Sequence, residues 1–191
     1  MLRKELDKPG DFTVLGGKTG SGKTATLMEL QKRGHQVVDL EGMAHHKGSA
    51  FGALGEEPQP STEHFENLIW NALRSMDPNR TVWLEDESRN VGRCVVPREL
   101  YSQMKRARII FLDIPREVRA GYLVEHYAGY QPEELKACIN RIAKKLGGVK
   151  TKQALDSVDE RNFFQTAMIT LAYYDKAYMF SLQKNHTGHE I

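Results

Sequence analysis

The sequence has little of what marks disulfide-rich, metal-binding or membrane proteins. Its only cysteines, Cys94 and Cys138, lie far apart and match neither a CxxC pair nor a zinc-binding spacing, so we expect reduced thiols in buried or half-buried packing positions. No stretch approaches the ~20 apolar residues that a membrane-spanning helix requires. Residues 1–5 lack the apolar segment of a secretion signal, and we therefore expect a cytoplasmic protein that does not enter a membrane.

The chain also lacks a large net charge. Its 27 Lys and Arg residues against 25 Asp and Glu residues give a formal charge of +2, which does not by itself indicate nucleic-acid binding. A basic surface would have to come from local clustering. With 191 residues and no internal repeats, the chain fits a single domain that can bury an ordinary hydrophobic core.

Short apolar runs alternate with helical patterns in the first part of the chain. The runs predict strands at residues 12–15, 36–41, 81–85 and 108–113. The intervening patterns predict helices at residues 24–32, 64–76 and 98–105. Beyond Pro115 the pattern is almost wholly helical, with predicted helices at residues 116–127, 132–146 and 158–182, and residues 189–191 suggest the stub of another strand. Residues 42–61 show no periodicity, which is typical of a functional or disordered loop.

A glycine-rich segment between the first strand and the first helix matches the phosphate-loop pattern G-x-x-x-x-G-K-[ST]. It consists of Gly17, Lys18, Thr19, Gly20, Ser21, Gly22, Lys23 and Thr24. The glycines let successive backbone N–H groups point into one hollow, and the next helix presents its positive end to an anion. Lys23 supplies a charge for the terminal phosphates and Thr24 a hydroxyl for Mg²⁺. A plain glycine turn is the alternative.

This motif, placed among alternating strands and helices, predicts an α/β fold of the P-loop NTPase type. We expect a parallel sheet with strand order 2-3-1-4, sandwiched by helices. Residues 1–115 would form the core, and residues 116–191 a helical lid with C-terminal helices packed on that core, as a single domain overall.

Acidic residues follow the third predicted strand, where α/β proteins gather their sites. Glu85 is predicted to contact Mg²⁺ together with Thr24, and Glu87 is a second acid. Lys23, Glu85 and Glu87 are predicted to be catalytic. A solvated acidic turn is the alternative. Arg119, after the fourth strand, is placed where P-loop kinases keep a charge-stabilising lid arginine, although a solvated helix face explains it equally well.

Polar residues at the end of the second strand and beyond it form a predicted substrate-binding set. Asp39 and Glu41, two residues apart on a strand, would point to the same face. The remaining members offer donors to anionic groups of a substrate or of tRNA, or are ordinary surface residues. They are His46, Lys47, Ser49, Arg89 and Arg93.

Several local motifs together resemble those of bacterial tRNA 2-selenouridine synthases. They include Asp39-Leu40-Glu41-Gly42-Met43-Ala44, His46-Lys47-Gly48-Ser49-Ala50-Phe51-Gly52, Gln59-Pro60-Ser61, Phe65-Glu66-Asn67, and Glu85-Asp86-Glu87-Ser88-Arg89 followed by Val91-Gly92 and Pro97. The resemblance covers residues 16–127. It implies replacement of sulfur by selenium in 2-thiouridine at the tRNA wobble position, with selenophosphate as the donor. It also implies transfer of a geranyl group from geranyl diphosphate to that sulfur.

The sequence departs from this family in two ways. Lys47 stands where the family generally has arginine. The lysine keeps the positive charge but lacks the guanidinium group, which can donate two parallel hydrogen bonds. The family's full-length members begin with a rhodanese-like domain carrying an essential cysteine, whereas about a dozen residues precede the first strand here. The resemblance therefore implies a rhodanese-like domain in the rest of the protein or in a separate subunit.

Three functions are consistent with these residues. The leading hypothesis is a transferase that binds tRNA and holds the diphosphate of geranyl diphosphate in the phosphate loop with Mg²⁺. The second is an ATP- or GTP-dependent kinase or NTPase with Glu85 or Glu87 as base. The third is a tRNA-docking module whose loop clamps a backbone phosphate.

Overall fold

The computed structural model describes residues 10–185, and within them the chain divides into two units. The first unit contains residues 10–17 and 22–112, and residue 185 is also assigned to it. The second contains residues 18–21 and 113–184. The division near residue 112 lies close to the predicted end of the core, and the lid role of the later helices stays a prediction.

A four-stranded parallel sheet forms the centre of the first unit. Its strands are β1 (Phe12–Gly17), β2 (Gln36–Val38), β3 (Val82–Glu85) and β6 (Arg108–Leu112). They are arranged in the order β2-β3-β1-β6, with Val14 of β1 opposite Leu84 and Ile109. The predicted order 2-3-1-4 and the α/β class are confirmed.

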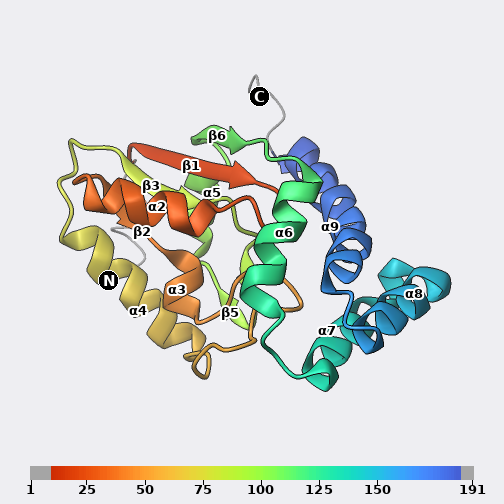
Figure 1. Ribbon diagram of the computed structural model, residues 1–191. Helices are drawn as coiled ribbons and strands as arrows, with labels where there is room; N and C mark the ends of the chain where they lie inside the picture. Colours follow the sequence, from red (N-terminus) through yellow and green to blue (C-terminus); the bar gives the residue numbers. More distant parts are fainter. Residues whose placement is uncertain (1–9, 186–191) are drawn as a thin grey trace. The chain divides into compact units, whose positions relative to one another are not determined.

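Helices cover both faces of this sheet (Figure 1). On one face Leu15 and Val37 pack against Leu27 of α2 (Lys23–Lys32). On the other, Val14 and Leu84 belong to a larger core that includes residues of α4 (Thr62–Arg74) and α5 (Arg98–Met104). Because successive residues of a strand point to opposite faces, neighbours such as Val14 and Leu15 serve different cores. The almost continuous apolar strands follow from this two-sided burial.

The second strand is shorter than predicted. It ends at Val38, and Asp39 begins the short helix α3 (Leu40–Ala44) by accepting a hydrogen bond from the Gly42 N–H at 2.7 Å. The prediction that residues 36–41 are one strand, with Asp39 and Glu41 on one face, is therefore wrong. Aspartate is a preferred helix-capping residue, and this local bond redirects the chain.

A small hairpin was not predicted. It pairs β4 (Asn90–Val91) with β5 (Cys94–Val95). Gly92 lies in its turn with φ +60°, a conformation that favours glycine. Strands of two residues carry too little periodicity to be recognised in a sequence.

Four helices make up most of the second unit. They are α6 (Arg116–Tyr127), α7 (Pro132–Leu146), α8 (Gly148–Asp159) and α9 (Phe163–Asn185). The bounds predicted for α6 and α7 are confirmed, while α8 was missed. The last helix begins five residues later than predicted, because Arg161 adopts φ +56° and the Asn162 side chain caps the Gln165 N–H.

Two expectations drawn from absences can be compared with the structure. Both cysteines are free and buried, as predicted. No helix in residues 10–185 combines the length and the apolar character needed to cross a membrane. Residues 1–5, where a secretion signal would lie, and residues 189–191, the predicted strand stub, are outside the described residues.

Candidate functional site

The phosphate loop joins β1 directly to α2. Gly20 and Gly22 both have φ +80°, which side-chain-bearing residues rarely adopt. Gly22 is the cap residue of α2, and no side chain caps the helix there. The first amides of α2 are therefore left to a ligand or to water. Helix α2 has ten residues, and its uncapped N-terminal end, which carries a partial positive charge, is suited to binding an anion.

Two polar groups of the loop fit a phosphate ligand. The Ser21 hydroxyl is buried and has no hydrogen-bond partner among the described residues. Leaving such a group unsatisfied costs about 1–3 kcal/mol, which an added acceptor would relieve. The Lys23 ammonium donates to the Gly17 carbonyl at 2.9 Å, so its charge is held at the start of the loop. The loop residues thus match the requirements of a phosphate.

A buried acidic cluster lies beside α2 in the first unit. The Thr24 hydroxyl donates to Glu41 Oε2 at 3.2 Å, and Glu41 is 8% exposed. Glu85 is fully buried, and its Oε2 accepts the Leu40 N–H at 3.0 Å. The structure therefore places Glu41 against the Thr24 hydroxyl, where the sequence led us to expect Glu85. The first turn of α3, which was read as strand, is what brings Glu41 there.

The environment favours the protonated form of two of these acids. Burial raises the pKa of Glu85 well above its usual value, and the nearby carboxylates of Asp39 and Glu41 raise it further. The hydrogen bond from the Leu40 amide opposes this shift. Burial and Glu41 also raise the pKa of Glu87, against the opposing charge of Lys23. A strongly perturbed acid next to a phosphate loop is typical of a functional site.

Gly48 is pressed against this cluster. It has φ +63°, and a Cβ added there would lie 2.8 Å from Glu41 Oε1 and 2.8 Å from Glu87 Oε1. The chain can approach the two carboxylates this closely only because glycine lacks a side chain. Part of the segment of residues 42–61, which shows no periodicity in the sequence, is therefore ordered and packs against the acidic cluster.

We expect Gly48→Ala to lower the free energy of unfolding by more than the ~1 kcal/mol that a left-handed alanine costs. Gly34→Ala is the matched control, because Gly34 has φ +84° and a Cβ added there would meet no atom within 4 Å. Urea unfolding followed by tryptophan fluorescence reports on this unit, which contains both tryptophans, Trp70 and Trp83. If Gly48→Ala and Gly34→Ala lowered the free energy of unfolding equally, the alanine Cβ at position 48 would not clash with the Glu41 and Glu87 carboxylates.

The other predicted substrate residues lie on loops of the first unit. Lys47 is exposed and forms an ion pair with Glu56 at 2.7 Å, while His46 and Ser49 are half-buried. Arg89 lies just before β4 and Arg93 lies in the turn of the β4–β5 hairpin; both are exposed, and the Arg93 guanidinium donates to the Gln59 carbonyl at 2.6 Å. The structure thus keeps both arginines accessible to an anionic partner.

Sequence reasoning missed the role of Gln59. Its amide nitrogen donates to the carbonyls of Ala44 and Val91 at 2.9 and 3.0 Å, and its side-chain oxygen accepts the Arg93 N–H at 3.0 Å. One side chain therefore links the end of α3 to the small hairpin. The motif Gln59-Pro60-Ser61 contributed to the family resemblance, but the sequence did not indicate the structural role of Gln59.

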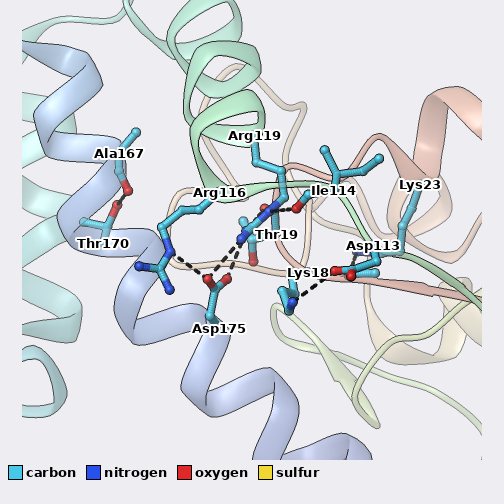
Figure 2. Close-up of polar contacts among 11 residues, drawn as sticks. Lys18, Thr19, Lys23, Asp113, Ile114, Arg116, Arg119, Ala167, Thr170 and Asp175 are labelled. Atoms are coloured by element: carbon cyan, nitrogen blue, oxygen red, sulfur yellow. Dashed lines mark hydrogen bonds and ion pairs between the residues drawn. The ribbon is translucent and has the colours of Figure 1, made fainter. Parts of the chain in front are cut away.

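Arg119 is buried in the second unit, with 2% of its surface exposed. Figure 2 shows its contacts with Thr19, Ile114 and Asp175. Its guanidinium donates to the carbonyls of Ile114 and Thr19, each at 2.9 Å, and to both oxygens of Asp175. Four of its five N–H groups are therefore engaged by protein acceptors. The sequence suggested a charge-stabilising lid arginine. That role stays a prediction, and in the structure Arg119 positions the phosphate loop through its hydrogen bond to the Thr19 carbonyl.

Asp175 of α9 completes this network. It also accepts a hydrogen bond from Arg116 Nε at 2.9 Å. Burial alone would raise its pKa, but hydrogen bonds from Arg119 and Arg116, and their charges, hold the pKa below its usual value. Within the same unit, Lys18 of the loop forms an ion pair with Asp113 at 3.3 Å. Loop residues 18 and 19 are thus held in this unit by one ion pair and by the hydrogen bond from Arg119 to the Thr19 carbonyl.

Comparisons with known proteins complete this description. A family model described as the tRNA 2-selenouridine synthase AAA domain matches residues 10–190. Proteins named tRNA 2-selenouridine synthase from Marinobacter nauticus and Shewanella loihica are 34% and 33% identical to this chain, over 91% and 90% of it. The protein of the same name from Shewanella sediminis is 32% identical over 96% of the chain.

The same alignments cover 54%, 53% and 57% of those three relatives. The chain therefore spans about half the length of the curated relatives it matches. No solved structure matches the chain.

Proposed function

The chain belongs to the tRNA 2-selenouridine synthase AAA domain family, and we propose on this premise that it is the phosphate-loop part of an enzyme that modifies 2-thiouridine in tRNA. The observation that carries the proposal is the family match over residues 10–190, which includes the loop and the acidic cluster. The fold places both features at the ends of parallel strands, where α/β proteins bind their ligands.

We propose that the loop binds the diphosphate of a donor, which for S-geranylation is geranyl diphosphate. Attack by a thiocarbonyl sulfur forms the new S–C bond while the C–O bond to diphosphate breaks, and the departing anion needs charge relief. Lys23, the uncapped amides of α2 and the orphaned Ser21 hydroxyl would supply it. In a later step the selenium of selenophosphate would attack C2 of the S-geranylated base, the C2–S bond would break with release of geranylthiol, and hydrolysis of the Se–P bond would release phosphate.

Thr24 and Glu41 would hold a Mg²⁺ ion bound with the donor, because their oxygens already lie 3.2 Å apart. When bound, the ion would neutralise charge on the diphosphate. Residues 10–185 contain no group of three or more His, Cys, Asp or Glu side chains arranged to hold a metal by themselves. This suits Mg²⁺, which usually takes most of its ligands from phosphate and water.

The proposed partners are tRNA and a rhodanese-like domain. Arg89 and Arg93, exposed beside the hairpin turn, are proposed to contact tRNA phosphates, together with His46 and Lys47. The curated relatives are about twice as long as this chain, which leaves room for a further domain in those proteins. We propose that selenium transfer requires such a domain, supplied in the same protein or by a separate subunit.

Titration calorimetry with Mg²⁺ and geranyl diphosphate, ATP, GTP or selenophosphate tests the choice of donor. We expect geranyl diphosphate to bind, and Lys23→Ala to weaken its binding about 10- to 100-fold, as expected for loss of a charged hydrogen bond of ~1.5–3 kcal/mol. Lys32→Ala, an exposed lysine on the same helix, is the control and should bind normally.

Mass spectrometry of tRNA carrying 2-thiouridine, after incubation with the chain and geranyl diphosphate, provides the second readout. A mass gain of one geranyl group in wild type, lost in Lys23→Ala, supports the proposal. Binding and turnover of ATP or GTP without binding of geranyl diphosphate would replace it with a kinase or NTPase function. Binding of tRNA alone, without any donor, would leave a docking module.

A further inference from the structure

The positive charge of the second unit is concentrated in one helical hairpin. Residues 135–155 contain six Lys and Arg residues and no Asp or Glu. Since the whole chain carries only +2, the rest of it carries a net charge of −4. A polyanion approaching this chain is therefore attracted toward residues 135–155, and the acidic residues of the two helices, Glu133, Glu134, Asp156 and Asp159, lie outside that stretch.

The hairpin consists of α7 and α8, which pack side by side (Figure 1). Gly147 joins them with φ +86°, and the Thr151 hydroxyl donates to the Gly147 carbonyl at 2.9 Å, closing the turn. The buried residues of α7 are apolar, and Ala154 and Val158 of α8 are buried as well. The apolar faces are thus used in packing, and the charged residues are left at the surface.

Five of the six basic residues are exposed around the tip of the hairpin. They are Arg141, Lys144, Lys145, Lys150 and Lys152. The sixth, Lys136, pairs with Asp159 farther from the tip. Arg141, Lys144 and Lys145 share a helix face, because residues three and four apart are neighbours on a helix. The first turn of α8 contains no acidic residue that would offset Lys150.

We propose that this basic tip, residues 141–152, is a docking surface for the phosphate backbone of tRNA. The inference rests on the proposed function, and it adds a binding surface on the second unit to the phosphate loop and to Arg89 and Arg93. Exposed lysines on a rigid hairpin match a line of phosphates by charge and require no base contacts. This surface therefore contributes affinity and orientation, and it leaves the choice of tRNA to other contacts.

Two double variants, Lys144→Gln/Lys145→Gln and Lys150→Gln/Lys152→Gln, test this surface on each helix separately. Each should weaken tRNA binding about tenfold at moderate salt. Each should also make the slope of log K against log salt shallower by between one and two, because each lost phosphate contact removes ~0.7–0.9 from it. The control is Lys32→Gln/Lys176→Gln, which removes two exposed lysines elsewhere.

Filter binding of tRNA across a salt series and calorimetry with geranyl diphosphate are run on the same preparations. The proposal predicts weakened tRNA binding with unchanged donor binding in both hairpin variants. Hairpin variants that bind tRNA like the control would overturn it and would leave Arg89 and Arg93 as the proposed contacts. Failure of the wild-type chain to bind tRNA at all would instead overturn the proposed function.

Discussion

An Asp175→Ala variant should lower the free energy of unfolding of the second unit by about 3–5 kcal/mol, the usual effect of removing one partner of a buried ion pair. Asp175 is the only carboxylate bonded to Arg119 among the described contacts, and the Arg119 side chain is 2% exposed. Its removal leaves a guanidinium charge buried without compensation. Thermal or urea unfolding followed by the helical circular dichroism signal measures the loss.

The exposed Asp156 of the neighbouring helix α8 provides the control. Asp156→Ala should change the free energy of unfolding by no more than about 0.5 kcal/mol, as surface substitutions usually do. Asp175→Asn should lower the free energy of unfolding by an amount between those of Asp175→Ala and Asp156→Ala, because the amide keeps one acceptor oxygen but loses the charge. Similar stability of Asp175→Ala and Asp156→Ala would show that the Arg119 charge finds water or another acceptor.

The same network bears on the phosphate loop. Arg119 donates to the Thr19 carbonyl at 2.9 Å, so a guanidinium released from Asp175 no longer holds that carbonyl in place. Loop amides bind phosphate well only when they are already oriented. We therefore expect weaker donor binding by Asp175→Ala at temperatures where the variant is still folded.

Local sequence signals were sufficient for much of the fold. The phosphate-loop motif fixed the strand–loop–helix order, and the buried parallel strands were visible as apolar runs. The start of α7 was marked in the sequence by Pro132, and the structure adds there a hydrogen bond from the Gln131 N–H to Glu134 Oε2 at 3.1 Å. Helix α8 was missed because its cap and its first residue are both glycines, Gly147 and Gly148, and it has neither a capping side chain nor an acidic first turn.

The site was predicted less well, because its geometry depends on contacts between distant segments. Thr24 contacts Glu41 because β2 ends at Val38, earlier than predicted. The capping hydrogen bond to Asp39 determines where the strand ends. That Arg119 is buried depends on Asp175, which lies 56 residues farther along the chain. A sequence pattern identifies such residues as polar and well placed, but it does not identify their partners.

The buried acid Glu85 should make the stability of the first unit depend on pH. Its pKa is raised above the ordinary value of 4.5 by burial and by the carboxylates of Asp39 and Glu41. Between pH 4.5 and that raised pKa, the folded chain holds a proton that the unfolded chain has released. The stabilisation is therefore fully present below pH 4.5 and is lost as pH rises through the raised pKa, with a slope of at most about 1.4 kcal/mol per pH unit for one proton.

Glu85→Gln should remove this contribution to the slope, because glutamine keeps an oxygen for the Leu40 N–H and does not ionise. The variant should therefore gain stability relative to wild type as the pH rises above 4.5, because only the wild type loses the contribution of the bound proton. Urea unfolding in magnesium-free buffer between pH 4 and 8, followed by tryptophan fluorescence, measures the difference. Glu57→Gln, at an exposed loop position, is the control and should follow the wild-type curve. If the free energy of unfolding of Glu85→Gln changed with pH in parallel with that of wild type, Glu85 would ionise as easily in the folded chain as in the unfolded chain. Its charge would then be compensated by groups other than the Leu40 amide.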